Sequence, residues 1–162
     1  HPLGDDPLAW AQLDETDGVY LTAGDQAGLR EARRARVLVA TARELPTLRS
    51  AGVQLDALVH SARDPAERYE LGDIDPVPRL VVSTEGSDGG RYVADGKEGR
   101  WAPAPLPGPL ADTYGAGDSF AAGLTFALAR GLAPQEAVEL AAASAAAAMT
   151  RHGAAYGGDP SV

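Results

Sequence analysis

The chain has 162 residues and a formal net charge of −9, from 14 basic and 23 acidic side chains. Binding to a phosphate backbone requires clustered positive charge, so we expect no nucleic-acid partner. Cysteine is absent, which excludes disulfides and thiolate metal sites. No apolar run approaches the roughly 20 residues that cross a bilayer, so we expect a cytoplasmic protein without a membrane partner.

Short apolar runs alternate with helix-like runs along the first half of the chain. The apolar runs predict strands at residues 18–24, 36–41, 55–61 and 78–86. The segments between them predict helices at residues 26–35 and 44–52 and a short helix near 64–72. Strands separated by helices indicate a parallel sheet with helices on its faces.

The second half of the chain breaks this rhythm. Residues 89–103 contain two β-type runs around ADGKEG, which predict an antiparallel hairpin at the edge of the sheet. After the proline-rich segment 102–110, one helix is expected to start near Asp118 and a second to occupy residues 134–153. No internal repeat is visible, so residues 1–162 are expected to form a single domain.

The segment DTYGAGDSFAAGL places Asp118 between a turn of small residues and an apolar helix. Asp118 or Ser119 could serve as an N-cap that satisfies the first N–H groups of this helix. The turn of Gly115, Ala116 and Gly117, however, has no bulk to cover its N–H groups, and the helix dipole adds positive charge there. A carboxylate beside such an anion site stays ionised and can accept a proton from an attacking hydroxyl. A small-molecule kinase needs this combination.

Three other interpretations of this segment are weaker. A dinucleotide-binding fingerprint needs a third glycine where Phe120 stands, and a bulky ring there blocks close helix–strand packing. A GDS-type serine hydrolase with Ser119 as nucleophile needs an asparagine, which the chain lacks, and a histidine paired with an acid. A Walker-type phosphate loop needs a lysine before serine or threonine, but Lys97, the one lysine of the chain, precedes glutamate.

The residues DTYGAGDSF closely resemble the C-terminal signature of the ribokinase-like (PfkB) carbohydrate kinases, D-T-x-G-A-G-D-x-F. The resemblance implies a ribokinase-like α/β fold with three α/β/α layers, a mostly parallel sheet and an edge β-hairpin. It also implies that Asp118 is the catalytic base and that Gly115, Ala116 and Gly117 form the anion hole. A site for a monovalent cation, K+, is implied at Asp112, Tyr114, Arg151 and Gly153.

Two upstream segments also resemble the family. The run VVSTEGSDGG ends a strand with T-x-G-x-x-G, although glycines are common in ordinary turns. The resemblance implies ATP binding by Thr84, Glu85, Gly86, Ser87, Asp88 and Gly89. The family element N-x-x-E, which organises Mg2+ and phosphate, is changed, because Ser61 stands where asparagine is expected and Asp64 where glutamate is expected. The resemblance places Asp64 at the Mg2+ site, and Ser61 and, on the last helix, Ala142 near ATP.

The resemblance runs from about residue 18 to residue 157 and matches the C-terminal half of the family. The half that carries the first strands, the sugar contacts and the lid is not found in residues 1–60, and the chain begins without methionine. We therefore expect the catalytic part of an ATP-dependent sugar kinase, inactive by itself, with ATP, Mg2+ and K+ as cofactors and a small sugar as substrate. A nucleoside kinase of the same superfamily and a non-catalytic nucleotide-binding relative stay open, and the family also allows a homodimer of the longer protein.

Overall fold

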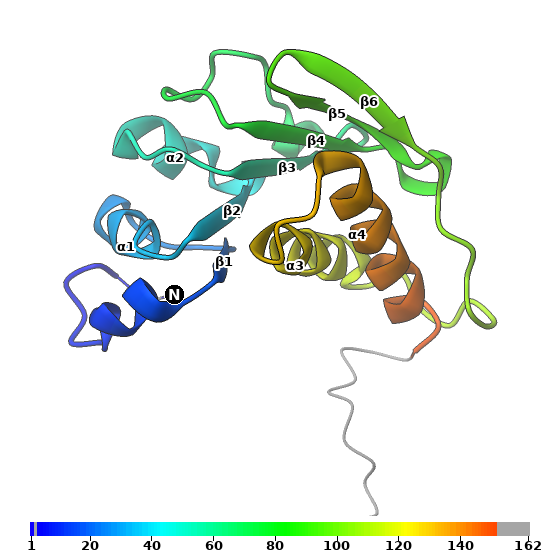
Figure 1. Ribbon diagram of the computed structural model, residues 1–162, viewed down its shortest axis with the longest axis horizontal. Helices are drawn as coiled ribbons and strands as arrows, with labels where there is room; N and C mark the ends of the chain where they lie inside the picture. Colours follow the sequence, from blue (N-terminus) through cyan, green and yellow to red (C-terminus); the bar gives the residue numbers. More distant parts are fainter. Residues whose placement is uncertain (2, 152–162) are drawn as a thin grey trace, which may run out of the picture.

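A six-stranded mixed sheet forms the centre of the computed structural model, which describes residue 1 and residues 3–151 (Figure 1). Its strands lie in chain order across the sheet: β1 (Gly18–Leu21), β2 (Val37–Thr41), β3 (Ala57–Ser61), β4 (Leu80–Thr84), β5 (Gly90–Ala94) and β6 (Lys97–Trp101). Strands β1 to β4 are parallel, whereas β5 and β6 form an antiparallel hairpin beside β4. The mostly parallel sheet and its edge hairpin are therefore confirmed.

In the described residues, four α-helices cover the two faces of the sheet (Figure 1). One face carries α1 (Gln26–Ala32) and α2 (Leu45–Ala51), and the other carries α3 (Ala116–Ala129) and α4 (Pro134–Ala148). Short 3₁₀ helices lie in the connections: η1 (Trp10–Glu15), η2 (Ala42–Glu44), η3 (Pro65–Glu67) and η4 (Gly86–Asp88). The result is three α/β/α layers, as expected. None of the described helices is long and apolar enough to cross a membrane.

Alternating side chains of the parallel strands fill a separate hydrophobic core on each face of the sheet. In β2, Val37 and Val39 belong to the core under α3 and α4, whereas Leu38 and Ala40 belong to the core under α1 and α2. Successive residues of a strand point to opposite faces, so a strand that is covered on both sides is apolar throughout. This burial explains the unbroken apolar run of β2 in the sequence.

The start of α3 and the helix expected near 64–72 differ from the sequence predictions. Helix α3 begins at Ala116, two residues before the expected Asp118, because Gly115 adopts a left-handed conformation (φ 77°) at the end of the preceding loop. The helix expected near 64–72 is a single 3₁₀ turn, since Arg68 leaves the helical region with a ψ of 120°. In both places the backbone conformation of one residue sets the boundary.

Helices α3 and α4 approach each other closely at Gly123. A Cβ atom at this position would lie 2.6 Å from the Ser144 Oγ and 3.1 Å from the Ala141 Cα, so glycine is required for the contact. Helix α4 ends at Ala148, earlier than the sequence predicts. The close contact restricts the rotation of α3 and therefore the direction in which its first turn points.

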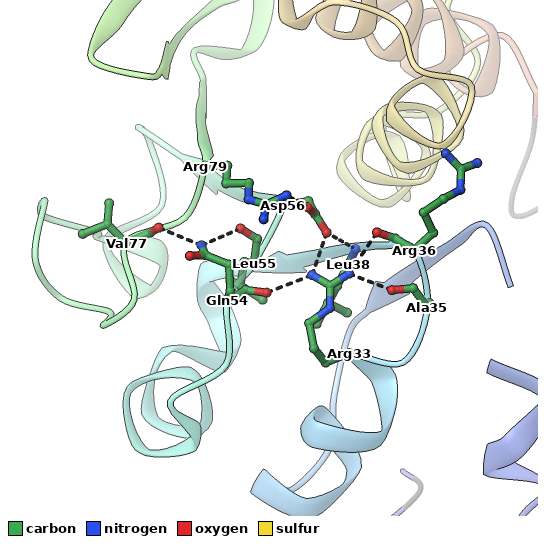
Figure 2. Close-up of polar contacts among 9 residues, drawn as sticks. All are labelled: Arg33, Ala35, Arg36, Leu38, Gln54, Leu55, Asp56, Val77 and Arg79. Carbon is green, nitrogen blue, oxygen red and sulfur yellow. Dashed lines mark hydrogen bonds and ion pairs between the residues drawn. The ribbon is translucent and has the colours of Figure 1, made fainter. Parts of the chain in front are cut away.

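The carboxylate of Asp56 ties together the N-terminal ends of β2, β3 and β4 (Figure 2). Its Oδ2 accepts hydrogen bonds from the Arg33 Nη1 at 2.7 Å and from the Leu38 N–H at 2.8 Å. Its Oδ1 accepts from the Arg79 Nη1 at 3.1 Å, and the Asp56 side chain is only 14% exposed. Arg33 also donates to three backbone carbonyls, those of Gln54, Ala35 and Arg36.

Replacing Asp56 with alanine should destabilise the fold, because it removes three hydrogen bonds and leaves Arg33 without its carboxylate. We expect the free energy of unfolding to fall by about 2–3 kcal/mol, measured by urea denaturation. The matched control is Asp17→Ala, since Asp17 is 78% exposed and pairs with Arg36 at the surface. Exposed pairs contribute little, so equal losses in the two variants would contradict the role given to Asp56.

Candidate active site

The first turn of α3 determines which contacts the Asp118 carboxylate can make. The N-cap of the helix is Gly115, with φ 77° and ψ 2°, and no side chain caps the helix. Asp118 is the third residue of α3, so neither Asp118 nor Ser119 is the N-cap that the sequence left open. The carboxylate therefore lies at the positive end of the helix without being used in a capping bond.

Several N–H groups of this turn are available to an anion. The Ser119 N–H donates to the Gly115 carbonyl at 2.9 Å, and the Ala116 N–H donates to the Thr113 carbonyl at 3.3 Å. Within the described part of the chain, the N–H groups of Gly117 and Asp118 have no protein acceptor. Unpaired N–H groups at the start of a long helix, together with its dipole, favour the binding of a negatively charged group.

Tyr20, at the C-terminal part of β1, holds the Asp118 carboxylate in place. The Tyr20 hydroxyl donates a hydrogen bond to the Asp118 Oδ1 at 3.1 Å, across 98 positions of sequence. Burial raises the pKa of Tyr20 well above its ordinary value of 10, and the negative charge of Asp118 raises it further. Tyr20 therefore stays protonated near neutral pH and remains a hydrogen-bond donor to Asp118.

An ion pair between Arg43 and Glu67 lies after the ends of β2 and β3. The Arg43 Nε donates to the Glu67 Oε1 at 2.6 Å, and the Ser61 N–H donates to the Glu67 Oε2 at 2.7 Å. Hydrogen bonding to Glu67 and the charge of that carboxylate raise the pKa of Arg43, and Asp64 and Asp118 add smaller effects. Glu67 is only 8% exposed, so a charged partner stabilises it in a nearly dry position.

The expected magnesium ligand, Asp64, is engaged in other contacts. Its Oδ1 accepts a hydrogen bond from the Ala66 N–H at 2.9 Å and so caps η3. Its Oδ2 lies 3.6 Å from the Arg43 Nη2. Among residues 3–151, no group of three or more histidine, aspartate or glutamate side chains is placed to hold a metal ion. Asp64 is thus held by the Ala66 N–H and lies near Arg43, and its role toward Mg2+ stays a prediction.

The two segments expected to bind ATP lie side by side. Ser61, the last residue of β3, is the register partner of Thr84, the last residue of β4. The loop that follows turns through Gly86 (φ 66°) and Gly89 (φ 81°) in left-handed conformations. A Cβ atom on Gly89 would lie 2.1 Å from the Trp101 carbonyl oxygen, so only glycine fits there. The backbone conformation of the loop therefore requires glycine at these two positions, independently of any ligand.

The acidic residues of this loop are paired with arginines. Glu85 forms ion pairs with Arg91 at 2.6 Å and with Arg100 at 3.2 Å. Asp88 pairs with Arg63 at 2.6 Å, and Arg63 follows β3 directly after Ser61 and Ala62. These pairs reduce the negative charge that the loop presents and connect it to the end of β3.

The expected cation site is only partly described. The Asp112 Oδ1 accepts from the Tyr114 N–H at 2.9 Å, and the Asp112 N–H donates to the Met149 carbonyl at 3.2 Å, which joins this loop to the end of α4. Arg151 lines the same hollow of about 610 Å³ as Tyr114 and Asp118, whereas Gly153 lies outside the described residues. Ala142, expected near the adenine, is 8% exposed and belongs to the core between α4 and the sheet.

Sequence reasoning missed three residues of this arrangement: Tyr20, Arg43 and Glu67. Each lies at or after the C-terminal end of a parallel strand, but none belongs to a motif with fixed spacing. The available signal was positional, since ligands of parallel α/β sheets bind beyond the carboxyl ends of the strands. Polar residues after 36–41 and 55–61 could have been selected on that ground, whereas Tyr20 lies within the predicted strand 18–24.

A family model described as pfkB family carbohydrate kinase matches residues 12–161 of the chain. The chain belongs to this family. The match includes the DTYGAGDSF segment and both upstream segments, so the resemblance found in the sequence is confirmed. PfkB kinases are phosphotransferases that use ATP and Mg2+.

The chain is similar to individual relatives over different fractions of its length. An inositol 3-kinase of Oryza sativa subsp. japonica is 44% identical over 73 residues, which is 45% of this chain and 18% of that protein. The ribokinase of Thermotoga maritima matches with a TM-score of 0.72 and 21% identity, over 92% of this chain and 55% of that one. The adenosine kinase of Sinorhizobium meliloti matches with a TM-score of 0.71 and 20% identity, over 93% of this chain and 54% of that one. The chain thus has the ribokinase-like fold and spans about half the length of these two structures.

The contact between Tyr20 and Asp118 predicts a specific dependence of stability on pH. Because the pKa of Tyr20 is raised in the folded chain, the folded state holds this proton more tightly than the unfolded state does. Its stabilising contribution is complete below the ordinary tyrosine pKa of about 10 and is lost as the pH rises above it. We therefore expect the free energy of unfolding to fall less steeply with pH in Tyr20→Phe than in the unaltered chain.

Urea denaturation at about pH 8 and pH 10.5 measures this difference. Tyr114→Phe is the matched control, because the Tyr114 side chain is 81% exposed and should leave the slope unchanged. Identical pH slopes in the unaltered chain and in Tyr20→Phe would show that Tyr20 is not held as described.

Proposed function

We propose that this chain carries the nucleotide-binding and catalytic part of an ATP-dependent kinase that phosphorylates a hydroxyl group of a carbohydrate or polyol. The observation that supports this proposal most directly is the first turn of α3. It combines the free N–H groups of Gly117 and Asp118 with a carboxylate that does not cap the helix. An anion site and a base within one turn suit phosphoryl transfer to an alcohol.

In this proposal, Asp118 accepts the proton of the acceptor hydroxyl as its oxygen bonds to the terminal phosphorus of ATP, and ADP departs. Tyr20 orients the carboxylate through its hydrogen bond to the Oδ1, which leaves the Oδ2 to accept the proton. The N–H groups of Gly115, Gly117 and Asp118 stabilise the negative charge of the group in transfer, whereas the Ala116 N–H donates to the Thr113 carbonyl. Removing such a base typically lowers the rate by about 10²- to 10⁴-fold.

The strand ends β3 and β4 suit the remainder of the nucleotide. Ser61 and Thr84 offer adjacent hydroxyl groups. Within the described residues, the N–H groups of Gly86 and Ser87 in the following loop have no protein acceptor and are available to a phosphate. Pairing of Glu85 and Asp88 with arginines lowers the repulsion that a triphosphate would otherwise meet. We propose this edge as the ATP site, and the Asp112–Tyr114 loop near α4 as the site of K+.

The family, and not the fold, supports the proposed class of acceptor. The family model is described as carbohydrate kinases, and the rice relative, 44% identical over 73 residues, is named for inositol, a polyol. Fold similarity does not separate sugars from nucleosides, because the ribokinase and the adenosine kinase have TM-scores of 0.72 and 0.71. An acceptor screen should therefore contain sugars, polyols and nucleosides.

Asp118→Asn tests the proposed base, since it keeps the size and hydrogen-bonding capacity of the side chain but removes its basicity. We expect phosphoryl transfer to fall by about 10²- to 10⁴-fold while ATP binding and the unfolding midpoint stay nearly unchanged. The assay uses the longest natural polypeptide that contains this chain and follows transfer of the labelled terminal phosphate.

Glu136→Gln is the matched control. Glu136 is also the third residue of a long helix, α4, and its carboxylate accepts a hydrogen bond from the Ala133 N–H at 3.1 Å. This variant should retain normal turnover. Retention of turnover by Asp118→Asn as well would contradict the proposed mechanism.

A further inference from the structure

We propose that Arg43 binds the terminal phosphate of ATP as a fixed cation of the transfer site, with Glu67 as the residue that positions its guanidinium. This inference rests on the proposed kinase function. It gives η2 and η3 the role of supplying a positively charged side chain at the terminal phosphate. Neither the DTYGAGDSF segment nor the glycine-rich loop supplies such a side chain.

The location of Arg43 supports this role. Helix η2 directly follows β2, which is hydrogen-bonded to β1 on one side and to β3 on the other. Tyr20 of β1 contacts Asp118, and the charges of Arg43 and Glu67 both act on Tyr20. The four side chains therefore gather at one edge of the sheet, beside the free N–H groups of α3.

Arg43 also has unused hydrogen-bonding capacity. A guanidinium carries five N–H donors, and in the described part of the chain Arg43 uses only its Nε in a hydrogen bond. Its side chain is 65% exposed. Arg33 provides the contrast, because its Nη1 and Nη2 donate four hydrogen bonds within the Asp56 network (Figure 2). Arg33 is a structural residue. Arg43 is hydrogen-bonded only at its Nε, and its Nη2 lies 3.6 Å from the Asp64 Oδ2.

Glu67 fixes the direction of this open guanidinium. One carboxylate oxygen accepts from the Arg43 Nε and the other from the Ser61 N–H, which anchors the pair to the end of β3. A side chain anchored in this way loses less entropy on binding a ligand, so its charge is preorganised. The planar fork of arginine suits phosphate oxygens, which accept two N–H groups at once.

Arg43 also lies near Asp64, whose Oδ2 is 3.6 Å from the Arg43 Nη2. Asp64 and Glu67 would together repel the phosphates of ATP, but Arg43 pairs with both carboxylates. The end of β3 therefore presents a guanidinium between two carboxylates in place of an open carboxylate pair. Arg43 offsets one of these two negative charges, so the repulsion that a phosphate group meets here is reduced.

The test compares the binding of ATP and ADP to this chain by calorimetry, with Arg43→Gln as the variant. A residue that binds the terminal phosphate matters for ATP and little for ADP, whereas a purely structural residue affects both nucleotides alike. We expect the ATP affinity of Arg43→Gln to fall by roughly 10- to 100-fold, with the ADP affinity nearly unchanged.

Two further variants make the result interpretable. Arg43→Gln combined with Glu67→Gln removes both charges, so no buried carboxylate is left unpaired, and it should give the same selective loss for ATP. Arg49→Gln is the matched control, because Arg49 of α2 pairs with Asp73 away from the strand ends. This variant should bind both nucleotides with normal affinity. The unfolding midpoint of each variant shows that it is folded.

The outcomes separate this inference from the function on which it rests. If the folded Arg43 variants retain the ratio of ATP to ADP affinity of the unaltered chain, the role of Arg43 is wrong and the kinase proposal stands. If the unaltered chain binds no ATP, the nucleotide site itself is wrong, and the role of Arg43 is overturned with it.

Discussion

The left-handed conformation of Gly115 is the constraint on which the site depends. It starts α3 at Ala116 and so places Asp118 inside the first turn instead of at the cap. Had Asp118 been the N-cap, its carboxylate would be occupied in a hydrogen bond to an N–H group of the following turn. The close contact of α3 with α4 at Gly123 then fixes the rotation of the helix, and the hydrogen bond from Tyr20 fixes the carboxylate itself.

The sheet separates stability from chemistry along its strands. At the N-terminal ends, Asp56 joins three strands and uses nearly all the hydrogen-bonding capacity of Arg33 (Figure 2). At the C-terminal ends, Arg43 and Ser61 keep polar groups that are only partly used within the described chain. This division is the usual one for parallel α/β sheets, whose ligands bind beyond the carboxyl ends of the strands.

The sequence allowed most of the fold to be predicted, because burial on both faces gives parallel strands an unmistakable apolar pattern. The parallel strands, the edge hairpin and the two long helices all followed from such patterns and are confirmed. The short helix expected near 64–72 was wrong in length, since helical propensity carries no information on where Arg68 turns away. Helix α3 was misplaced by two residues because one glycine dihedral decides its start.

The candidate site was predictable only where residues are close in sequence. Residues 112–118 form one turn and its approach, so a local motif describes them completely. The contact between Tyr20 and Asp118 spans 98 positions, and that between Arg43 and Glu67 spans 24, so both depend on how the strands are ordered. Contacts of this kind become visible only when the three-dimensional arrangement is known.

The central claim is that the first turn of α3 binds the phosphates of ATP. Backbone amide NMR of the chain, recorded as magnesium–ATP is added, tests it most directly, because the N–H groups of Gly115, Gly117 and Asp118 report on a bound anion. We expect saturable shifts that are largest at these three residues and at Thr84 to Gly89. Shifts confined to other parts of the chain, or none at all in a folded sample, would contradict the account.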